Sequence, residues 1–409
     1  MSIISIRDGL LATQDSSRRV FRGNLIIEDG KIISVGGELD KSDTLIDASG
    51  SLVMPGLANM HTHLGMSMLR GRLTSANNLD EFLKITSEFD KGNDSESVKR
   101  SVLLGMAEMI STGTTSFLDL YYSEEITAYL AEKVGIRGFL SWAILDKEYT
   151  TQEGIPIENA EKFVKKYGNM EMVRPSFGIQ GVYVCSEETI KKVAELAEKY
   201  NTIIHLHLAE TEEEVRGHID KCGERPAEFL NKRKILSRRV GAAHCVWLDD
   251  EEIKSFSSSG ATMIYNPISN AKLRSGRAKA KELLQNRVNM AIGTDSTGSN
   301  DNLDMFQTMK FGALIGDLSP QSILDMATIN AAKFLGEPIG SLEKGKYADV
   351  IILDLKKPLG FPTDEKNAIS NSVYSLEGGS VSTSIISGKV VMQDRKFISP
   401  EFEELGFPT

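Results

Sequence analysis

Short apolar runs and amphipathic stretches alternate along most of the chain. Eight segments have the apolar, β-branched pattern of buried strands: 52–60, 115–120, 136–145, 173–184, 202–208, 240–247, 261–265 and 289–294. The stretches between them have helical periodicity, as in 96–112, which ends at Gly113. Ser186, followed by two glutamates, is predicted to cap a helix that extends to Tyr200. Eight strand–helix units in series predict an α/β fold of the (β/α)8 TIM-barrel type.

The two ends of the chain show strands without intervening helices. Their strand patterns lie at 24–28, 31–35, 348–354 and 384–391. The dipeptide Asp29-Gly30 between the first two is a two-residue hairpin signal. We expect both ends to build one small β-sandwich domain, residues 1–54 and 343–409, around a barrel of residues 55–342.

Polar side chains gather where the predicted strands end. The residues at or just beyond these carboxyl ends are His61, His63, Gln180, His207, His244 and Asp295. An open doubly wound sheet would have the same alternation of strands and helices, but barrel enzymes assemble their sites at these strand ends. His61 and His63 are two residues apart in one strand, so one metal ion can accept both imidazoles.

Composition narrows the class of partner. The 409 residues carry a formal net charge of -10, which gives no electrostatic basis for binding nucleic acid or an anionic membrane, so we expect a small-molecule ligand. No uncharged apolar run reaches the ~20 residues that span a bilayer, and the N-terminal residues lack the features of a signal peptide. Three cysteines without Cys-x-x-Cys spacing fit a reducing compartment. A cytoplasmic protein is therefore expected.

Four motifs, in this order along the chain, resemble those of the amidohydrolase superfamily. They are Pro-Gly-Leu-Ala-Asn-Met-His-Thr-His at 55–63, Ala-Ala-His-Cys at 242–245, Asn-Pro-Ile-Ser-Asn at 266–270 and Gly-Thr-Asp-Ser at 293–296. Within that superfamily the chain is most similar to the methylthioadenosine/S-adenosylhomocysteine deaminase and chlorotriazine hydrolase group. The resemblance extends through 345–349 and implies a metal-bearing barrel with a flanking β-sandwich.

The resemblance implies a mononuclear metal site. One divalent ion would be bound by His61, His63, His207 and Asp295, with water or hydroxide in the remaining position. Zinc is expected, with iron and manganese as alternatives, because three imidazoles and a carboxylate suit all three. A metal lowers the pKa of bound water toward ~7, and Asp295 would accept the proton. Binuclear members carry a bridging lysine on the fourth strand, but residues 172–184 contain none.

The resemblance also implies catalytic roles for Glu210 and His244. Glu210 matches the proton shuttle of the family, and His244 would orient the hydroxide or stabilise developing charge. Each assignment has a structural alternative. Glu210 begins an acidic run that is typical of an exposed helix, and Asp295 could cap the loop that follows it, as aspartate often does. We expect His205 to pack near the site and His218 to lie on the solvated surface.

The substrate-binding residues depart from the family pattern. Gln180 stands where the methylthioadenosine deaminase group has a substrate-contacting histidine, and an amide cannot become a cation. Asp90, or with poorer spacing Glu88, is expected to bind ribose hydroxyls. Ser299 and Arg70 are further residues that the resemblance places near the substrate.

The implied activity is that of a metal-dependent hydrolase acting on carbon–nitrogen bonds other than peptide bonds. Metal-bound hydroxide would deaminate an amino-substituted purine, nucleoside or related N-heterocycle and release ammonia. A hydrolase of cyclic amides or halogenated rings is the alternative on the same scaffold, and a non-catalytic scaffold protein is a third reading. The expected partners are the small N-heterocycle and water, in a protein that forms a homo-oligomer.

Overall fold

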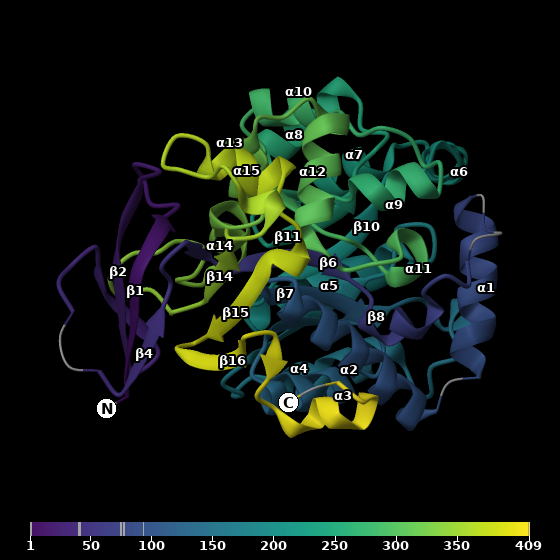
Figure 1. The fold of residues 1–409 in the computed structure, drawn as a ribbon. Coiled ribbons are helices and arrows are strands. Elements are labelled where there is room, and N and C mark those ends of the chain that lie inside the picture. Colours follow the sequence, from purple (N-terminus) through teal and green to yellow (C-terminus); the bar gives the residue numbers. More distant parts are fainter. Residues whose placement is uncertain (1, 40–41, 74–75, 77, 93, 408) are drawn as a thin grey trace.

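A barrel of parallel strands and a second sheet from the chain ends make up the fold (Figure 1). The structure is a computed structural model, and it describes residues 2–39, 42–73, 76, 78–92, 94–407 and 409. Figure 1 shows the N-terminal strands at one side of the barrel and the helix of residues 79–91 at the opposite side.

Eight parallel strands form the barrel in the part of the chain that the structure describes. They are β6 (Leu57–Thr62), β7 (Thr114–Tyr121), β8 (Arg137–Ile144), β9 (Val173–Ile179), β10 (Ile204–Leu208), β11 (Val240–His244), β12 (Thr262–Tyr265) and β13 (Asn289–Ile292). Just after β13, the backbone N–H of Asp295 donates to the carbonyl of His61 at 2.8 Å. This bond brings the last strand against the first, so the barrel is nearly closed and the predicted fold class is confirmed.

Further helices lie between the barrel strands and after them along the chain. They are α2 (Ser95–Ser111), α3 (Glu124–Val134), α4 (Pro156–Tyr167), α5 (Glu187–Lys199), α6 (Glu212–Cys222), α7 (Pro226–Lys232), α8 (Asp250–Ser259), α9 (Pro267–Lys272), α10 (Ala280–Gln285), α11 (Thr297–Asn300), α12 (Met305–Gly316), α13 (Pro320–Met326), α14 (Ile329–Leu335) and α15 (Ala368–Tyr374). Ser186 caps α5 as predicted, because its hydroxyl accepts the N–H of Thr189 at 3.3 Å.

Shorter elements and one isolated helix complete the chain. The 3-10 helices are η1 (Leu64–Leu69), η2 (Lys147–Tyr149), η3 (Pro358–Gly360), η4 (Gly378–Ser380) and η5 (Pro400–Leu405). Helix α1 (Leu79–Lys91) lies at the edge of the molecule in Figure 1. Its amphipathic sequence buries Phe82 against Leu73 and Leu273.

The second sheet joins strands from both ends of the chain. Its order is β17-β16-β15-β14-β5-β1-β2-β3, with β4 paired to β1. The bounds are β1 (Ile3–Ala12), β2 (Val20–Glu28), β3 (Lys31–Val35), β4 (Thr44–Asp47), β5 (Ser51–Pro55), β14 (Val350–Asp354), β15 (Val381–Ile386), β16 (Lys389–Gln393) and β17 (Lys396–Phe397). The Asp29-Gly30 hairpin is confirmed: both residues have positive φ, 45° and 83°, as a type I′ turn requires.

Two predicted strand segments are each divided in the structure. The segment 52–60 is split at Gly56, so that β5 belongs to the end sheet and β6 to the barrel. A Cβ at Gly56 would lie 2.1 Å from Oγ1 of Thr115, so only glycine permits this close crossing of the chain. The segment 384–391 is likewise two strands, because Ser387-Gly388 turns the chain with φ of 47° and 71°.

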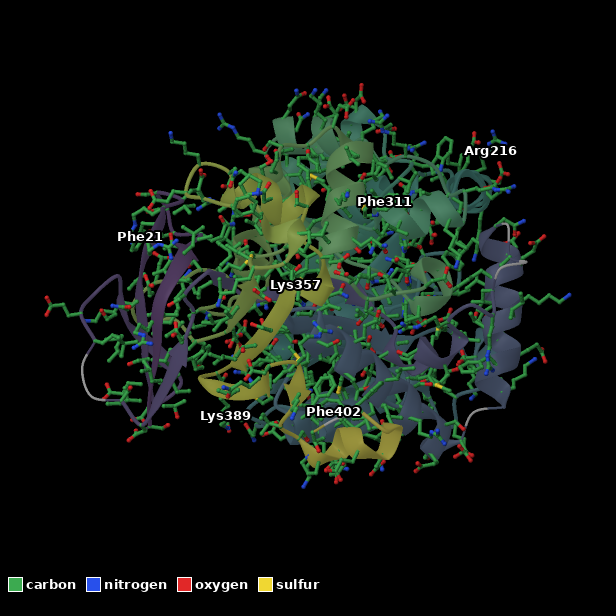
Figure 2. All side chains as sticks on the ribbon, in the orientation of Figure 1. Phe21, Arg216, Phe311, Lys357, Lys389 and Phe402 are labelled. Atoms are coloured by element: carbon green, nitrogen blue, oxygen red, sulfur yellow. The ribbon has the colours of Figure 1, made fainter. Side chains whose placement is uncertain are left out.

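Charged side chains cover the outside of the molecule (Figure 2). Arg216 and Lys389 project into solvent there, whereas Phe402 is buried. None of the helices within the described ranges is both long enough and apolar enough to cross a membrane.

A buried ion pair ties the barrel to the end sheet. Arg137 at the start of β8 donates from Nε and Nη2 to the carboxylate of Asp349, both at 3.2 Å, and each side chain is 2% exposed. Nη2 also donates to the hydroxyl of Ser387 at 2.6 Å, whose backbone N–H donates to Asp349 at 2.8 Å. The two charges are therefore fully paired across the junction.

The substitution Arg137→Met should strongly lower the free energy of unfolding. It leaves the Asp349 carboxylate buried without its cation, which costs about 3–5 kcal/mol of unfolding free energy. Chemical denaturation followed by circular dichroism measures the change. The control is Arg7→Met, because Arg7 pairs with Asp47 at the surface with the two side chains 47% and 54% exposed, and this change should cost at most about 1 kcal/mol. Equal effects of the two substitutions would contradict the prediction.

Candidate metal centre and catalytic pocket

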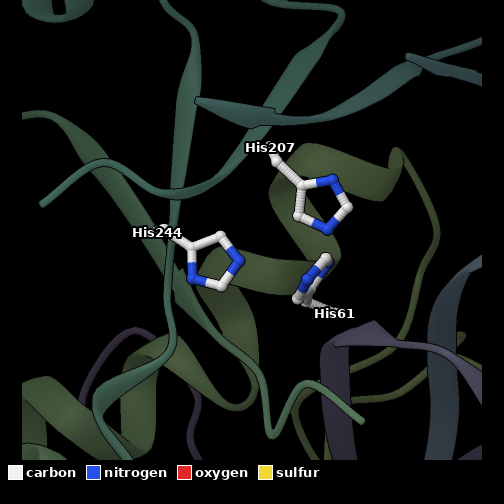
Figure 3. Close-up of side chains that lie close together, drawn as sticks. All are labelled: His61, His207 and His244. Atoms are coloured by element: carbon white, nitrogen blue, oxygen red, sulfur yellow. The ribbon is translucent and has the colours of Figure 1, made fainter. Parts of the chain in front are cut away.

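Buried imidazoles from separate strands converge at the carboxyl end of the barrel. Figure 3 shows the rings of His61, His207 and His244, from β6, β10 and β11, directed toward one another. One nitrogen from each of these rings lies within 4.8 Å of the others, and the same holds for ligand atoms of His61, His63 and Asp295. All five side chains are buried.

The four predicted metal ligands lie together in this cluster. Oδ1 of Asp295 is 3.3 Å from Nε2 of His63 and 3.6 Å from Nε2 of His61. Nε2 of His207 is 3.3 Å from Nε2 of His63. Nε2 of His61 is buried and has no hydrogen-bond partner among the described residues. Imidazole nitrogens and a carboxylate oxygen directed at one point are a donor set that a divalent cation satisfies, so the residues present fit a metal ion.

The partners of the opposite ring nitrogens orient these ligands. Nδ1 of His63 is 2.5 Å from the carbonyl of Leu120, and Nδ1 of His207 is 2.7 Å from the carbonyl of Gln180. A carbonyl only accepts, so we assign the proton to Nδ1, which leaves each Nε2 lone pair facing the centre. Nδ1 of His61 lies 2.8 Å from Nε2 of His205. His205 therefore packs beside the site and holds the ring of His61.

Burial sets the protonation of the ligands. It holds the pKa of His61 well below its usual range and lowers the pKa of His207 to about 3, because a cation loses its hydration there. Burial acts to raise the pKa of Asp295, but the hydrogen bond and charge of His63 outweigh it and the pKa falls below its usual range. Burial acts to lower the pKa of His63, but the hydrogen bond and charge of Asp295 outweigh it, and the pKa of His63 rises above its usual value. A proton and a metal thus compete for His63.

Glu210 and His244 face each other beside this centre. Oε2 of Glu210 is 3.7 Å from Nε2 of His244, and the hydroxyl of Ser275 donates to Oε1 of Glu210 at 3.0 Å. Nδ1 of His244 lies 2.8 Å from Oδ1 of Asn270. Burial raises the pKa of Glu210 above its usual range, opposed by the charge of His244. A carboxyl group in this state is suited to donate a proton.

Left-handed backbone at the strand ends aims these side chains. Ala209, His244 and Asp295 have φ of 49°, 72° and 67° at the ends of β10, β11 and β13. Non-glycine residues rarely adopt this conformation, and such strain is concentrated at functional sites. At Ala209 the chain reverses after His207, and the carboxylate of Glu210 lies 3.7 Å from Nε2 of His244.

Glu214 is a residue of the site that the sequence interpretation missed. Its carboxylate accepts the backbone N–H of Ala209 at 3.0 Å and that of Glu210 at 2.7 Å. The hydroxyl of Thr211 accepts the backbone N–H of Glu214. Burial raises the pKa of Glu214 to about 7. The signal was present as a Thr-x-x-Glu capping pattern at 211–214. The acidic run after Glu210 is therefore not purely a solvated surface, because Glu214 within it holds the backbone at the start of α6.

A cavity of about 450 Å³ opens above the predicted metal ligands. His63, His207, Glu210 and Gln180 line its inner part, and side chains of α1 line another wall. Asp90, near the end of α1, lines it too, and its carboxylate accepts the hydroxyl of Tyr121. Burial raises the pKa of Asp90.

Other residues named from the sequence lie elsewhere. Ser299 is fully buried and shares a hydrogen bond of 3.2 Å with Ser296, and it is not among the residues that line the cavity. Arg70 pairs with Glu108, and Glu88 pairs with Lys91 at 2.6 Å on the surface. None of these three predicted residues borders the cavity.

The prediction that His218 is solvated is wrong. The side chain is buried on α6, with Nδ1 2.7 Å from the carbonyl of Glu224 and its ring 5.0 Å from that of Phe229. The charged residues on both sides of His218 concealed this, because only one face of α6 packs on the protein. His218 has a structural role in that contact.

Asp295→Asn should weaken metal binding. The amide loses the negative charge that the carboxylate offers to the cation, so we expect affinity to fall by more than about tenfold. Metal content after dialysis, measured by plasma mass spectrometry, reports the change. Asp317→Asn is the control, since Asp317 lies on the surface in a pair with Lys281. Equal metal content in both variants would count against Asp295 as a ligand.

Comparisons with known proteins agree with this geometry. The model of the amidohydrolase family matches residues 52–391. A 5'-deoxyadenosine deaminase of Methanosarcina mazei is 36% identical, with 96% of this chain and 94% of the relative covered. A 5-methylthioadenosine/S-adenosylhomocysteine deaminase of Thermococcus sibiricus is 37% identical over the same shares, 96% and 94%.

Solved structures with the same fold extend the comparison. An adenosine deaminase from Xanthomonas campestris with bound zinc superposes with a TM-score of 0.92 at 26% identity, over 98% of this chain and 96% of that one. An atrazine chlorohydrolase from Arthrobacter aurescens has a TM-score of 0.91 at 23% identity, over 98% of both chains, and shares the fold. The predicted resemblance and hydrolase class are confirmed. The chain belongs to the amidohydrolase family.

Proposed function

We propose that the protein is a metal-dependent aminohydrolase that removes the amino group from the adenine ring of a nucleoside and releases ammonia. The observation that carries the proposal is a buried cation site that shares one cavity with Glu210, a carboxyl group whose pKa is raised. Relatives named as deaminases of 5'-deoxyadenosine and of methylthioadenosine support the adenine ring as the reacting part.

The metal is proposed to be one zinc ion held by His61, His63, His207 and Asp295, since a related deaminase structure carries zinc. Iron and manganese remain chemically suitable for the same ligands. When bound, a divalent ion lowers the pKa of water toward ~7 and so supplies a nucleophile at neutral pH. Asp295, whose Oδ1 lies 3.3 Å from Nε2 of His63, would accept the proton that this water loses.

Glu210 is proposed to carry the other proton. Protonated, its carboxyl group donates to a ring nitrogen next to the carbon that is attacked, which makes that carbon more electrophilic. The hydrogen bond from Ser275 fixes Oε1, so Oε2 is the oxygen left to face the cavity and His244. His244, oriented through Asn270, orients the attacking water and stabilises the charge that develops.

Gln180 and Asp90 are proposed to recognise the nucleoside. The carboxamide of Gln180 both donates and accepts, as a purine edge requires, and the side chain lines the cavity. The carboxylate of Asp90 can accept from ribose hydroxyls in addition to Tyr121. The cytoplasmic location and the homo-oligomer stay predictions from the sequence.

Ammonia release by metal-reconstituted protein tests the proposal. The panel contains adenosine, 5'-deoxyadenosine, methylthioadenosine, guanine and cytosine. We expect ammonia from the adenine nucleosides. If the fully metallated protein released no ammonia from any compound, deamination would be refuted. The two alternatives on this scaffold would then be tested by their products, since cyclic-amide hydrolysis gives a carboxylate and dehalogenation gives a halide.

Glu210→Gln should keep the metal and lose turnover. Glutamine preserves size and the contact with Ser275 but cannot transfer a proton, so we expect kcat to fall by about 100-fold or more. Metal content and kcat are measured on the same sample. Glu213→Gln is the matched control, since Glu213 is exposed in the first turn of α6. Near-normal turnover in Glu210→Gln would show that another group carries the proton.

A further inference from the structure

One short segment of the chain contacts both carboxyl groups that are proposed to transfer protons. Residues 266–275 comprise helix α9 and the residues on either side of it. Within them, the hydroxyl of Ser269 donates to Oδ2 of Asp295 at 2.6 Å, and the hydroxyl of Ser275 donates to Oε1 of Glu210 at 3.0 Å. Both serines are buried, so little water competes for these hydrogen bonds. One segment therefore holds an oxygen of each carboxyl group.

The hydrogen bond from Ser269 fixes the direction of Asp295. Oδ1 of Asp295 accepts the backbone N–H of Ser296 at 2.7 Å and lies 3.3 Å from Nε2 of His63. Because Ser269 donates to Oδ2, each oxygen has a directional contact and the plane of the carboxylate is fixed. Oδ1 is therefore the oxygen directed at the imidazoles. Outer hydrogen bonds of this kind set the direction in which a carboxylate offers its lone pair to a cation.

Ser275 has the same relation to Glu210. Its hydroxyl holds Oε1, whereas Oε2 of Glu210 lies 3.7 Å from Nε2 of His244, and both of these side chains line the cavity. A contact at Oε1 restricts rotation of the carboxyl group, so Oε2 keeps this direction. Proton transfer requires alignment of this kind between the donor and the atom that receives the proton.

The start of the segment orients His244 as well. Oδ1 of Asn270 lies 2.8 Å from Nδ1 of His244, and Oδ1 of Asn266 accepts the backbone N–H of His244 at 3.2 Å. Nδ2 of Asn266 donates to the carbonyl of Gly293, just after β13, at 3.1 Å. These bonds tie the start of the segment to the ends of β11 and β13.

The end of the segment is fixed by its backbone. The N–H of Ser275 donates to the carbonyl of Asn270 at 2.9 Å, and the indole N–H of Trp247 donates to the carbonyl of Ser275 at 2.7 Å. The backbone N–H of Trp247 in turn donates to the carbonyl of Ala209 at 3.0 Å. Ser275 is therefore held against the loops that follow β10 and β11, and its hydroxyl has a defined direction.

We propose that residues 266–275 are one positioning element of the reaction, in which Ser269 and Ser275 each hold one oxygen of a carboxyl group and so direct the other. Ser269 directs Oδ1 of Asp295 toward the cation site, and Ser275 directs Oε2 of Glu210 toward the cavity. The inference rests on the proposed function and adds these two positioning residues to it. Neither serine is among the described residues that line the cavity, so each acts through the carboxyl group that it contacts.

Removal of the Ser275 hydroxyl tests its link with Glu210. In the zinc-loaded enzyme, Ser275→Ala should lower kcat about tenfold and change KM by less than about twofold, because the cavity lining stays the same while the proton donor is misaligned. In the Glu210→Gln background the same substitution should change kcat by less than about twofold, since the group that Ser275 positions no longer transfers a proton. Ammonia release at raised enzyme concentration measures both pairs. A general structural role of Ser275 would lower kcat equally in the two backgrounds.

Ser269→Ala tests the link with Asp295 without relying on turnover. The zinc affinity of the metal-free protein, measured by competition with a chromophoric chelator, should fall about tenfold. Ser275→Ala should keep the wild-type zinc affinity, because Ser275 contacts Glu210 and none of the proposed ligands. Ser258→Ala is the matched control for both serines, since Ser258 is exposed on α8 and its hydroxyl bonds only within that helix. It should change neither zinc affinity nor kcat.

The outcomes separate this inference from the proposed function. Wild-type zinc affinity in Ser269→Ala, or an undiminished kcat in Ser275→Ala, would overturn the inference and leave adenine deamination standing. Equal losses of kcat from Ser275→Ala in the two backgrounds would overturn it as well. If the zinc-loaded wild-type protein released no ammonia, the proposed function would fall, and the zinc affinity of Ser269→Ala would still decide whether Ser269 positions Asp295.

Discussion

The cluster of buried imidazoles around Asp295 is the constraint on which the rest of the structure depends. A buried polar atom without a partner costs about 1–3 kcal/mol, and Nε2 of His61 has none among the described residues. Left-handed backbone at His244 and Asp295 adds strain at the same place. A bound cation satisfies the converging lone pairs. Metal binding therefore offsets the loss of stability that these buried, unpartnered atoms cause.

The barrel backbone holds this cluster in place. Carbonyls of Leu120 and Gln180 receive the Nδ1 protons of two ligands, and His205 contacts the third imidazole. Leu120 lies near the carboxyl end of β7 and Gln180 directly follows β9, whereas His205 lies within β10. Rigid strands thereby fix the direction of each lone pair, and the loop that carries Glu210 is held separately by Glu214.

The cavity joins two kinds of surface with different tasks. Its inner part presents titratable groups whose pKa values burial has moved, as at Glu210 and His207. Its outer wall is apolar and comes partly from α1, a helix apart from the strand–helix units of the barrel. The titratable groups of the cavity therefore come mainly from the barrel, and its apolar wall comes partly from a helix added to the barrel.

Local sequence patterns by themselves determined much of the fold and the site. Short-range signals could be predicted from the sequence because each involves only neighbouring residues. Examples are the hydrophobic periodicity of the strands and helices, the cap at Ser186 and the Asp29-Gly30 turn. The shared direction of His61 and His63 follows from the strand repeat alone. The order of motifs predicted four metal ligands, and the barrel brings these side chains together at the carboxyl ends of its strands.

Tertiary structure alone decided the features that join distant parts of the chain. Arg137 and Asp349 are 212 residues apart, and neither carries a local signal of its partner. Gly56 divides one apolar run because Thr115 crosses it, and His218 is buried by packing that its charged neighbours conceal. Contacts of this kind depend on which surfaces the fold brings together. Local sequence patterns therefore do not predict them.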